Sequence, residues 1–160
     1  MTMTTPRHVS DSRSIQSYLL MPMHLNAKGS LFGGQLLSWI DMLAGIVALR
    51  HADSNVTTVA IDHLEFKEPA HKSGVITLDG RVTWTGRTSM EVRVDTWKEN
   101  KGGERLLINR AYLVMVAVDD NDGRPIPVPP LEPVTDEERT EWAAAEKRAQ
   151  LRKQRRNEAF

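Results

Sequence analysis

Residues 26–41 read NAKGSLFGGQLLSWID, a glycine-rich loop that leads into the chain's one strongly apolar helix. Beyond the loop, apolar side chains recur at the i, i+3, i+4, i+7 spacing that buries one stripe of a helix against a core. They are Leu36, Leu37, Ile40, Leu43, Ala44 and Val47. We therefore expect a central helix from about Gly33 to His51, ended by the turn residues 52–55.

A second stripe of this helix, beside the apolar one, is made of small residues and one acid. Its members are Gly34, Ser38, Asp41, Gly45 and Ala48. Small residues let another backbone or a thin ligand approach closely, and Asp41 would point into that approach. Because both lie on one stripe, we expect Asp41 beside the helix start at Gly34.

The helix start is a candidate site for an oxyanion. The first N–H groups of a helix have no partner within it and lie at the positive end of its dipole, so Gly33 and Gly34 would leave donors unscreened. Taken singly, Gly33-Gly34 reads as a tight turn, Asn26 as a turn residue and Asp41 as an exposed acid. Their combination favours an active site.

These residues resemble a known signature, N-x-x-G-x-x-F-G-G-x-x-x-x-x-x-D, of hotdog-fold acyl-CoA thioesterases in the cytosolic acyl-CoA hydrolase group. The resemblance spans about Ser17 to Leu131. Its matches are Met21-Pro22, Asn26, Gly29, Phe32-Gly33-Gly34, Asp41, Val59 to Asp62, Phe66 with Pro69, Gly86 to Val92, and Arg124 to Leu131.

The resemblance implies an α+β hotdog fold, in which a curled antiparallel sheet of about five strands wraps around one central helix. It also implies hydrolysis of fatty acyl-CoA to fatty acid and coenzyme A, which would be substrate and product, so that no separate cofactor and no metal is expected. Two hotdogs pair edge to edge in this family, with each site at their interface, and the pairs often form hexamers. A homodimer, assembled as a trimer of dimers, is the expected partner arrangement.

Thioester hydrolysis needs an activated water or nucleophile and a stabilised oxyanion. We expect the Gly34 N–H to be the oxyanion donor and Asp41 to activate water, with direct attack by its carboxylate as the other possibility. Asn26 would orient water or the thioester, by analogy from the opposite chain. Gly33 and the turn Arg87-Thr88-Ser89 are candidate groups for holding the coenzyme, although that turn alone reads as structural.

Composition bounds the protein class. The chain has 160 residues, 40% hydrophobic and 26% charged, which fits one ordinary globular domain. Its 21 Lys and Arg balance 21 Asp and Glu, so no general field favours nucleic acid or an anionic membrane. Cysteine is absent, and no signal peptide or transmembrane run is recognisable. We expect a soluble protein, and the resemblance implies a cytoplasmic enzyme of fatty acid metabolism.

The remaining chain predicts three segments: a flexible N-terminal arm (1–14), the hotdog domain (15–131) and a charged C-terminal helix (132–160). Runs at about 15–21, 56–66, 76–84, 90–95 and 106–118 read as strands joined by hairpin turns. A change of phase predicts a bulge near Asp62-His63. Residues 76–84 and 90–95 alternate as strands with one buried face, and the run 106–118, continuously apolar after Arg110, is expected at the middle of the sheet.

The C-terminal helix should follow an extended, proline-rich segment at 125–133 and begin at a capping box, Thr135 to Glu138. Its cations are Lys147, Arg148, Arg152, Lys153, Arg155 and Arg156. We favour a solvated face for them over a role at the nucleotide end of a ligand. The acidic residues 119–123 predict a turn rather than a calcium loop.

Two other functions remain open at this point. A hotdog dehydratase or hydratase would need a histidine paired with an acid near the helix, and His24 and His51 lie at its wrong ends. A non-catalytic acyl-CoA-binding module would keep Arg87 and the small-residue stripe but would not need Asp41. Release of free thiol separates that module from a hydrolase.

Overall fold

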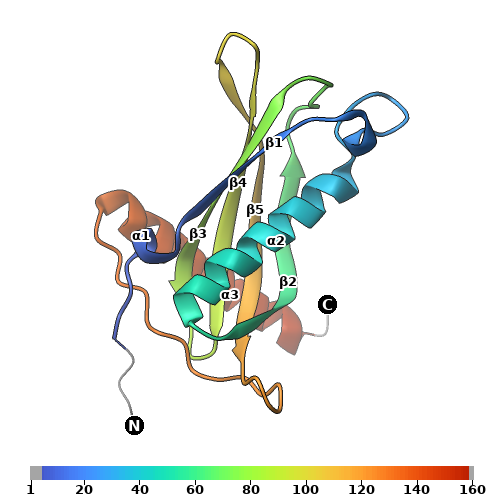
Figure 1. The fold of residues 1–160 in the computed structure, drawn as a ribbon. Coiled ribbons are helices and arrows are strands. Elements are labelled where there is room, and N and C mark those ends of the chain that lie inside the picture. Colours follow the sequence, from blue (N-terminus) through green and yellow to red (C-terminus); the bar gives the residue numbers. More distant parts are fainter. Residues whose placement is uncertain (1–4, 159–160) are drawn as a thin grey trace.

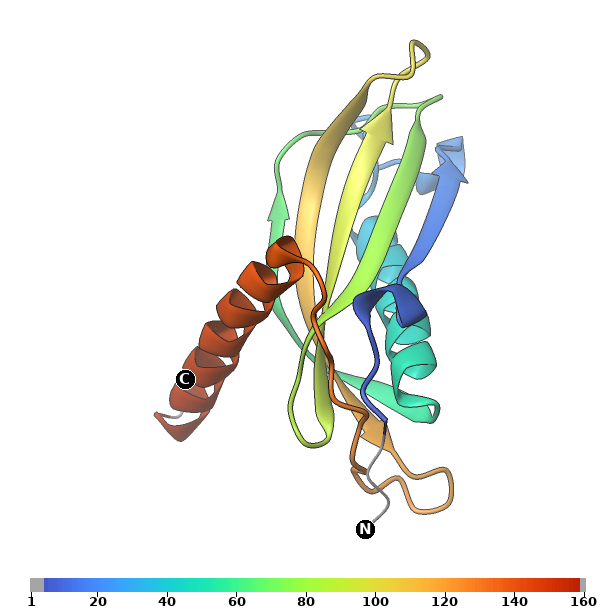
Figure 2. The ribbon, with the colours of Figure 1, turned by 90° about the vertical axis from the view of Figure 1, so that its left-hand side faces the viewer.

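The computed structural model describes residues 5–158 as a five-stranded antiparallel sheet with a long helix on each face (Figures 1 and 2). The elements are α1 (Val9–Ser12), β1 (Ser14–Leu19), the 3-10 turn η1 (Pro22–His24), α2 (Gly33–Ala52), β2 (Asn55–Phe66), β3 (Val75–Thr85), β4 (Ser89–Glu99), β5 (Arg105–Val118) and α3 (Asp136–Asn157). Their order in the sheet is β1-β3-β4-β5-β2. The expected α+β arrangement, with one central and one C-terminal helix, is confirmed.

The central helix α2 packs its apolar stripe on the inner, concave face of the sheet (Figure 1). Ile40, Leu43 and Val47 are fully buried there. A Cβ added at Gly80 of β3 would lie 3.0 Å from Val47 and 3.1 Å from Leu43, so a larger residue would push the helix away from the strand. The predicted bounds of this helix hold to within one residue of its end at Ala52.

The outer face of the sheet is also covered, which corrects the expectation of a solvated face for β4. Glu91, Arg93 and Asp95 are only 0%, 8% and 2% exposed: α3 lies over the first two (Figure 2), and arginines of β3, β4 and β5 enclose Asp95. β4 is the middle strand, and the apolar β5 is second from the edge rather than central. The edge strands are β1 and β2.

β2 is an irregular edge strand. Its pairing with β5 shifts between Ile61 and His63, which confirms the bulge predicted near Asp62, and shifts once more between Thr58 and Ala60. Val59 and Asp62 are therefore the two residues left out of the ladder. Such bulges bend a strand and re-aim its side chains.

The N-terminal segment is hydrogen-bonded to the proline-rich segment that follows β5. Of the expected arm, residues 1–4 lie outside the described residues, whereas Val9 is 6% exposed in the core and Arg7 N donates to Pro130 O at 2.9 Å. Backbone hydrogen bonds to the extended proline-rich segment thus fix the N-terminal segment around Arg7, although that segment has no apolar periodicity of its own. The capping box at Thr135 is confirmed, since its hydroxyl accepts from Glu138 N. Among the described residues, no helix is long and apolar enough to cross a membrane.

Candidate active site

The loop before α2 fixes Asn26 by its own side chain. Asn26 Oδ1 accepts from the N–H groups of Lys28 at 2.9 Å and Ser30 at 3.2 Å. Gly29 closes the turn with a φ of 75°, which a residue with a side chain rarely adopts. With its oxygen engaged in the loop, Asn26 has its Nδ2 group left as a donor for a ligand.

Two aromatic rings flank the glycine pair at the start of α2. A Cβ at Gly34 would lie 2.6 Å from the Phe32 ring, and one at Gly33 would lie 3.3 Å from the Phe66 ring. Helical bonding begins only at Gln35 and Leu36, whose N–H groups donate to Phe32 O at 3.0 and 3.1 Å. The Gly33 and Gly34 N–H groups precede these bonds, as an anion-binding helix start requires.

A cavity of about 420 Å³ opens beside this glycine pair. Its apolar walls come mainly from Leu31, Leu36, Phe66 and Ile108, and Asn26 stands among its polar lining. Gly33 also lines it. An apolar cavity with a few polar groups at one side suits a ligand that combines a hydrocarbon part with a polar reacting group.

Asp41 lies elsewhere, on the exposed side of α2 facing the edge strand. Its Oδ1 accepts a hydrogen bond of 2.7 Å from the Thr58 hydroxyl of β2. Thr58 was not among the residues that the sequence singled out, because a threonine in a strand is an ordinary β-former. Only its placement opposite Asp41 distinguishes it from Thr57.

The structure separates Asp41 from the glycine pair within one chain. Asp41 follows Gly34 by seven residues, which is about 10 Å along the helix axis at 1.5 Å per residue. The expectation that Asp41 lies beside the Gly34 donor is therefore wrong for a single chain. A shared stripe gives a shared side of the helix, but two turns still lie between the residues.

Strand register places the two groups of residues at opposite ends of the sheet. Phe66, beside the cavity, pairs with Asn109, which pairs with Thr96 of β4. Thr58 pairs with Met115, which pairs with Met90 at the start of β4. We call these two places the Phe66 end and the Thr58 end of β2.

The turn formed by Arg87, Thr88 and Ser89 lies at the Thr58 end, at the bottom of the sheet in Figure 1. Arg87 O and Thr88 O accept backbone bonds from Val128 and Ala117, so part of this turn is structural. The Arg87 side chain itself is exposed. It is available to meet an anion from solvent.

Neither of the two histidines considered for a dehydratase is paired with an acid at the helix. His51 is fully buried and its Nε2 lies 2.9 Å from Pro129 O, while burial lowers its pKa and keeps the ring neutral. His24 packs edge-on against Trp39, with 5.0 Å between ring centroids. Both side chains serve packing.

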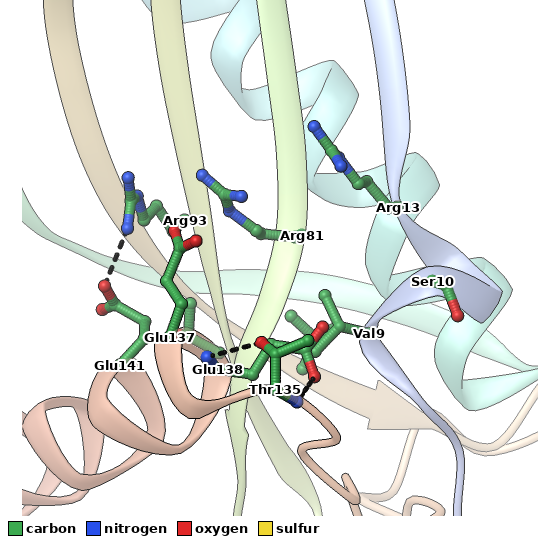
Figure 3. A pocket seen from close by; sticks show the side chains of 11 residues that line it. Val9, Ser10, Arg13, Arg81, Arg93, Thr135, Glu137, Glu138 and Glu141 are labelled. Atoms are coloured by element: carbon green, nitrogen blue, oxygen red, sulfur yellow. Dashed lines mark hydrogen bonds and ion pairs between the residues drawn. The ribbon is translucent and has the colours of Figure 1, made fainter.

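A second cavity, of about 260 Å³, lies on the outer face between α1, β3 and the start of α3 (Figure 3). Its charged groups neutralise one another: Arg93 pairs with Glu141 at 2.8 Å, and Arg81 with Asp95 at 3.0 Å. The sheet separates this cavity from Asn26. We do not assign it to the active site.

Comparison with known proteins decides the family. A model of the thioesterase superfamily matches residues 28–104. The acyl-CoA thioester hydrolase YkhA of Bacillus subtilis is 38% identical over 157 residues, which are 96% of this chain and 91% of that protein. The chain belongs to the acyl-CoA thioester hydrolases.

Solved structures agree with this membership and confirm the hotdog fold of the thioesterase. An apo-hexameric acyl-CoA thioesterase is 43% identical, with a TM-score of 0.91 over 94% of this chain and 97% of that one. The acyl-CoA hydrolase of Staphylococcus aureus, in complex with butyryl coenzyme A and coenzyme A, is 31% identical, with a TM-score of 0.90 over 96% and 93%.

Three further structures of the Staphylococcus aureus hydrolase carry a single alanine, in place of an asparagine, an aspartate or a threonine. In that enzyme the three positions are spaced by 15 and 17 residues. The same spacing separates Asn26, Asp41 and Thr58 in this thioesterase.

Proposed function

We propose that this thioesterase hydrolyses fatty acyl-CoA at a site built from two chains, in which the Phe66 end of one β2 meets the Thr58 end of another. The observation that carries the proposal is the separation of Gly34 from Asp41 within one chain. A single water can be activated by Asp41 and attack a carbonyl held at Gly34 only if both lie within about 3 Å of the reacting atoms. One chain alone does not meet this condition.

Pairing of two β2 edges across a two-fold axis would remove the separation. An isologous antiparallel pair sets the end of one strand beside the beginning of the other. The open edge of β2 supports such pairing, since Val59 and Ile61 are exposed there at 55% and 39%. Asn26 and Gly34 of one chain would then face Asp41 and Thr58 of its partner. Three such dimers would make a hexamer.

Each group has a role in the proposed reaction. The thioester carbonyl oxygen accepts from the Gly34 N–H and from Asn26 Nδ2, which stabilise the negative charge that develops on it. The partner's Asp41 takes a proton from the water that attacks the carbonyl carbon, or attacks it directly as a nucleophile. The Thr58 hydroxyl orients this carboxylate. When the tetrahedral intermediate collapses, the C–S bond breaks and the thiolate takes the proton held by Asp41, which releases the fatty acid and coenzyme A. If Asp41 attacks directly, thiolate departure leaves an acyl-aspartyl anhydride, which water must then hydrolyse to fatty acid and free carboxylate.

The two ends also divide the substrate between them. The apolar cavity at Leu36 and Ile108 suits the acyl chain. The exposed Arg87, with Thr88 and Ser89, is proposed to meet the phosphates of the coenzyme, which a chain of zero net charge must bind locally. The matching spacing of Asn26, Asp41 and Thr58 in the Staphylococcus aureus variants supports the assignment of these three residues. A cytoplasmic location stays a prediction.

Complementation between two inactive chains tests the shared site. An Asn26→Ala chain and an Asp41→Ala chain should each be inactive, while mixing them should restore activity because some hybrid dimers hold one intact site. Release of free thiol from acyl-CoA measures the recovery. Subunit exchange is established separately with differently tagged chains. No recovery despite proven exchange would place the site within one chain, and thiol release unaffected by Asp41→Ala would favour a role for Asp41 outside chemistry.

A further inference from the structure

The bulge of β2 at Asp62 is held by the C-terminal helix α3. Asp62, the residue left out of the ladder, accepts at Oδ2 from Arg152 at 2.9 Å and at Oδ1 from Arg155 at 2.6 Å. Its side chain is only 9% exposed. Burial opposes its ionisation, yet the bonds from Arg152 and Arg155 outweigh that effect and hold the pKa of Asp62 below its ordinary value.

Arg152 is itself anchored to the middle of the sheet. Its Nη1 also contacts Glu91 Oε2 at 2.7 Å, and Glu91 is fully buried. A second arginine of α3, Arg148, binds the same carboxylate at 2.8 Å, and Thr83 of β3 donates to it at 2.8 Å. Arg152 therefore connects the irregular edge strand to the rigid central strand β4.

This connection sits close to the proposed reaction chemistry. Asp62 follows Thr58 by four residues, and Val59 between them is the other residue outside the ladder. Only Ala60 and Ile61 remain paired between the two bulges. Ladder bonds alone fix the path of this short piece weakly, so a bulge held from outside would set the direction of the strand that carries Thr58.

We propose that Arg152, assisted by Arg155, is a positioning residue for hydrolysis: it pins the Asp62 bulge and so keeps the Thr58 hydroxyl on the carboxylate of Asp41. This inference rests on the proposed role of Asp41 and Thr58. It also gives Arg152 and Arg155, which the sequence placed on a solvated face of α3, a role in the proposed site. Because neither Asp62 nor Arg152 lines the acyl cavity, release of the bulge should impair chemistry more than substrate binding.

We call the contact of Arg152 and Arg155 with Asp62 the clamp. Asp62→Asn and Arg152→Gln test it in the 160-residue chain. Each should lower kcat by about tenfold to a hundredfold, the scale of a misplaced catalytic group, while KM changes less than about twofold. Arg152→Lys, which keeps the charge, should recover part of the loss. Arg156→Gln is the matched control. Arg156 is an exposed cation near the same end of α3 and makes no ion pair with any of residues 5–158.

The Thr58→Ala background decides whether the clamp acts through Thr58. Adding Asp62→Asn to Thr58→Ala should cause little further loss of kcat, because the effects of two substitutions that act through the same residue do not add. Losses that multiply fully would overturn the clamp, as would a normal kcat in Asp62→Asn. Arg152→Gln leaves the buried Glu91 with one partner fewer, so thermal unfolding and oligomer size are measured for every variant. Asp62→Asn preserves the Arg152–Glu91 pair and decides the question if Arg152→Gln does not fold. A normal kcat in Thr58→Ala itself would instead remove Thr58 from the proposed function.

Discussion

The Phe66 end of β2 has backbone donors and an apolar cavity, whereas the Thr58 end has a carboxylate and a hydroxyl. The first end has few groups that can exchange a proton but much apolar surface. The second has a proton acceptor, and neither Asp41 nor Thr58 lines the acyl cavity. The difference agrees with the proposed division of labour, in which one end binds and polarises the substrate and the other supplies the proton acceptor.

The largest expected effect comes from removing the proton acceptor at the Thr58 end. Asp41→Asn should preserve folding and lower kcat by at least about a hundredfold, the contribution of an acid–base group. Thiol release under saturating acyl-CoA measures it, with circular dichroism as the control for folding. Near-normal turnover would remove the chemical role from this end.

A smaller effect is expected from crowding the donors at the Phe66 end. Gly34→Ala adds a Cβ only 2.6 Å from the Phe32 ring, so the ring must turn away and the helix start must shift. We expect kcat to fall by about tenfold or more, as for a weakened oxyanion donor. A double variant, Gly34→Ala with Phe32→Ala, provides the control: recovery in it assigns the loss to the clash.

Removing the cation of the β3–β4 turn should act on binding alone. Arg87→Ala is expected to raise KM several-fold and to change kcat little, because phosphates far from the thioester are held equally in ground and transition states. The defect should disappear with a short thioester that lacks the nucleotide. Equal defects on both substrates would show that Arg87 supports the fold or the reaction.

The smallest expected effect is the pH dependence of the stability that Asp62 contributes through Arg152 and Arg155. The pKa of Asp62 is lowered on folding, so its contribution to stability is present above the ordinary aspartate pKa and is lost as pH falls through the lowered value. The difference in Tm between the parent chain and Asp62→Asn should therefore stay constant from about pH 8 to pH 5 and shrink below about pH 4. Loss of the difference near pH 6 to 7 would point to another titrating group.

Much of this arrangement could be predicted from local pattern. The apolar spacing from Leu36 to Val47 located α2, because a helix on a sheet needs that stripe. The change of phase near Asp62 located a bulge, since side-chain alternation reports register directly. Both signals come from residues close in sequence.

The errors arose where distant segments decide the outcome. Glu91, Arg93 and Asp95 alternate like a solvated face, and nothing local in β4 shows that α3 covers them. The continuous apolar run of β5 suggested the middle of the sheet, whereas it reflects cover on both faces, with Arg148 packed 3.9 Å over the Tyr112 ring. Thr58 could not be singled out from the sequence, because its contact with Asp41 depends on how β2 packs beside α2.

The clamp between α3 and β2 also has a consequence for the order of events during synthesis. Asp62 and Arg152 are 90 residues apart, so a ribosome that adds about 5–20 residues per second makes Arg152 some 5–20 s after Asp62. During that interval the edge strand exists without the helix that pins its bulge. We expect nascent chains to present an unfinished edge, so that partner chains are matched along β2 only after α3 has been released and has docked.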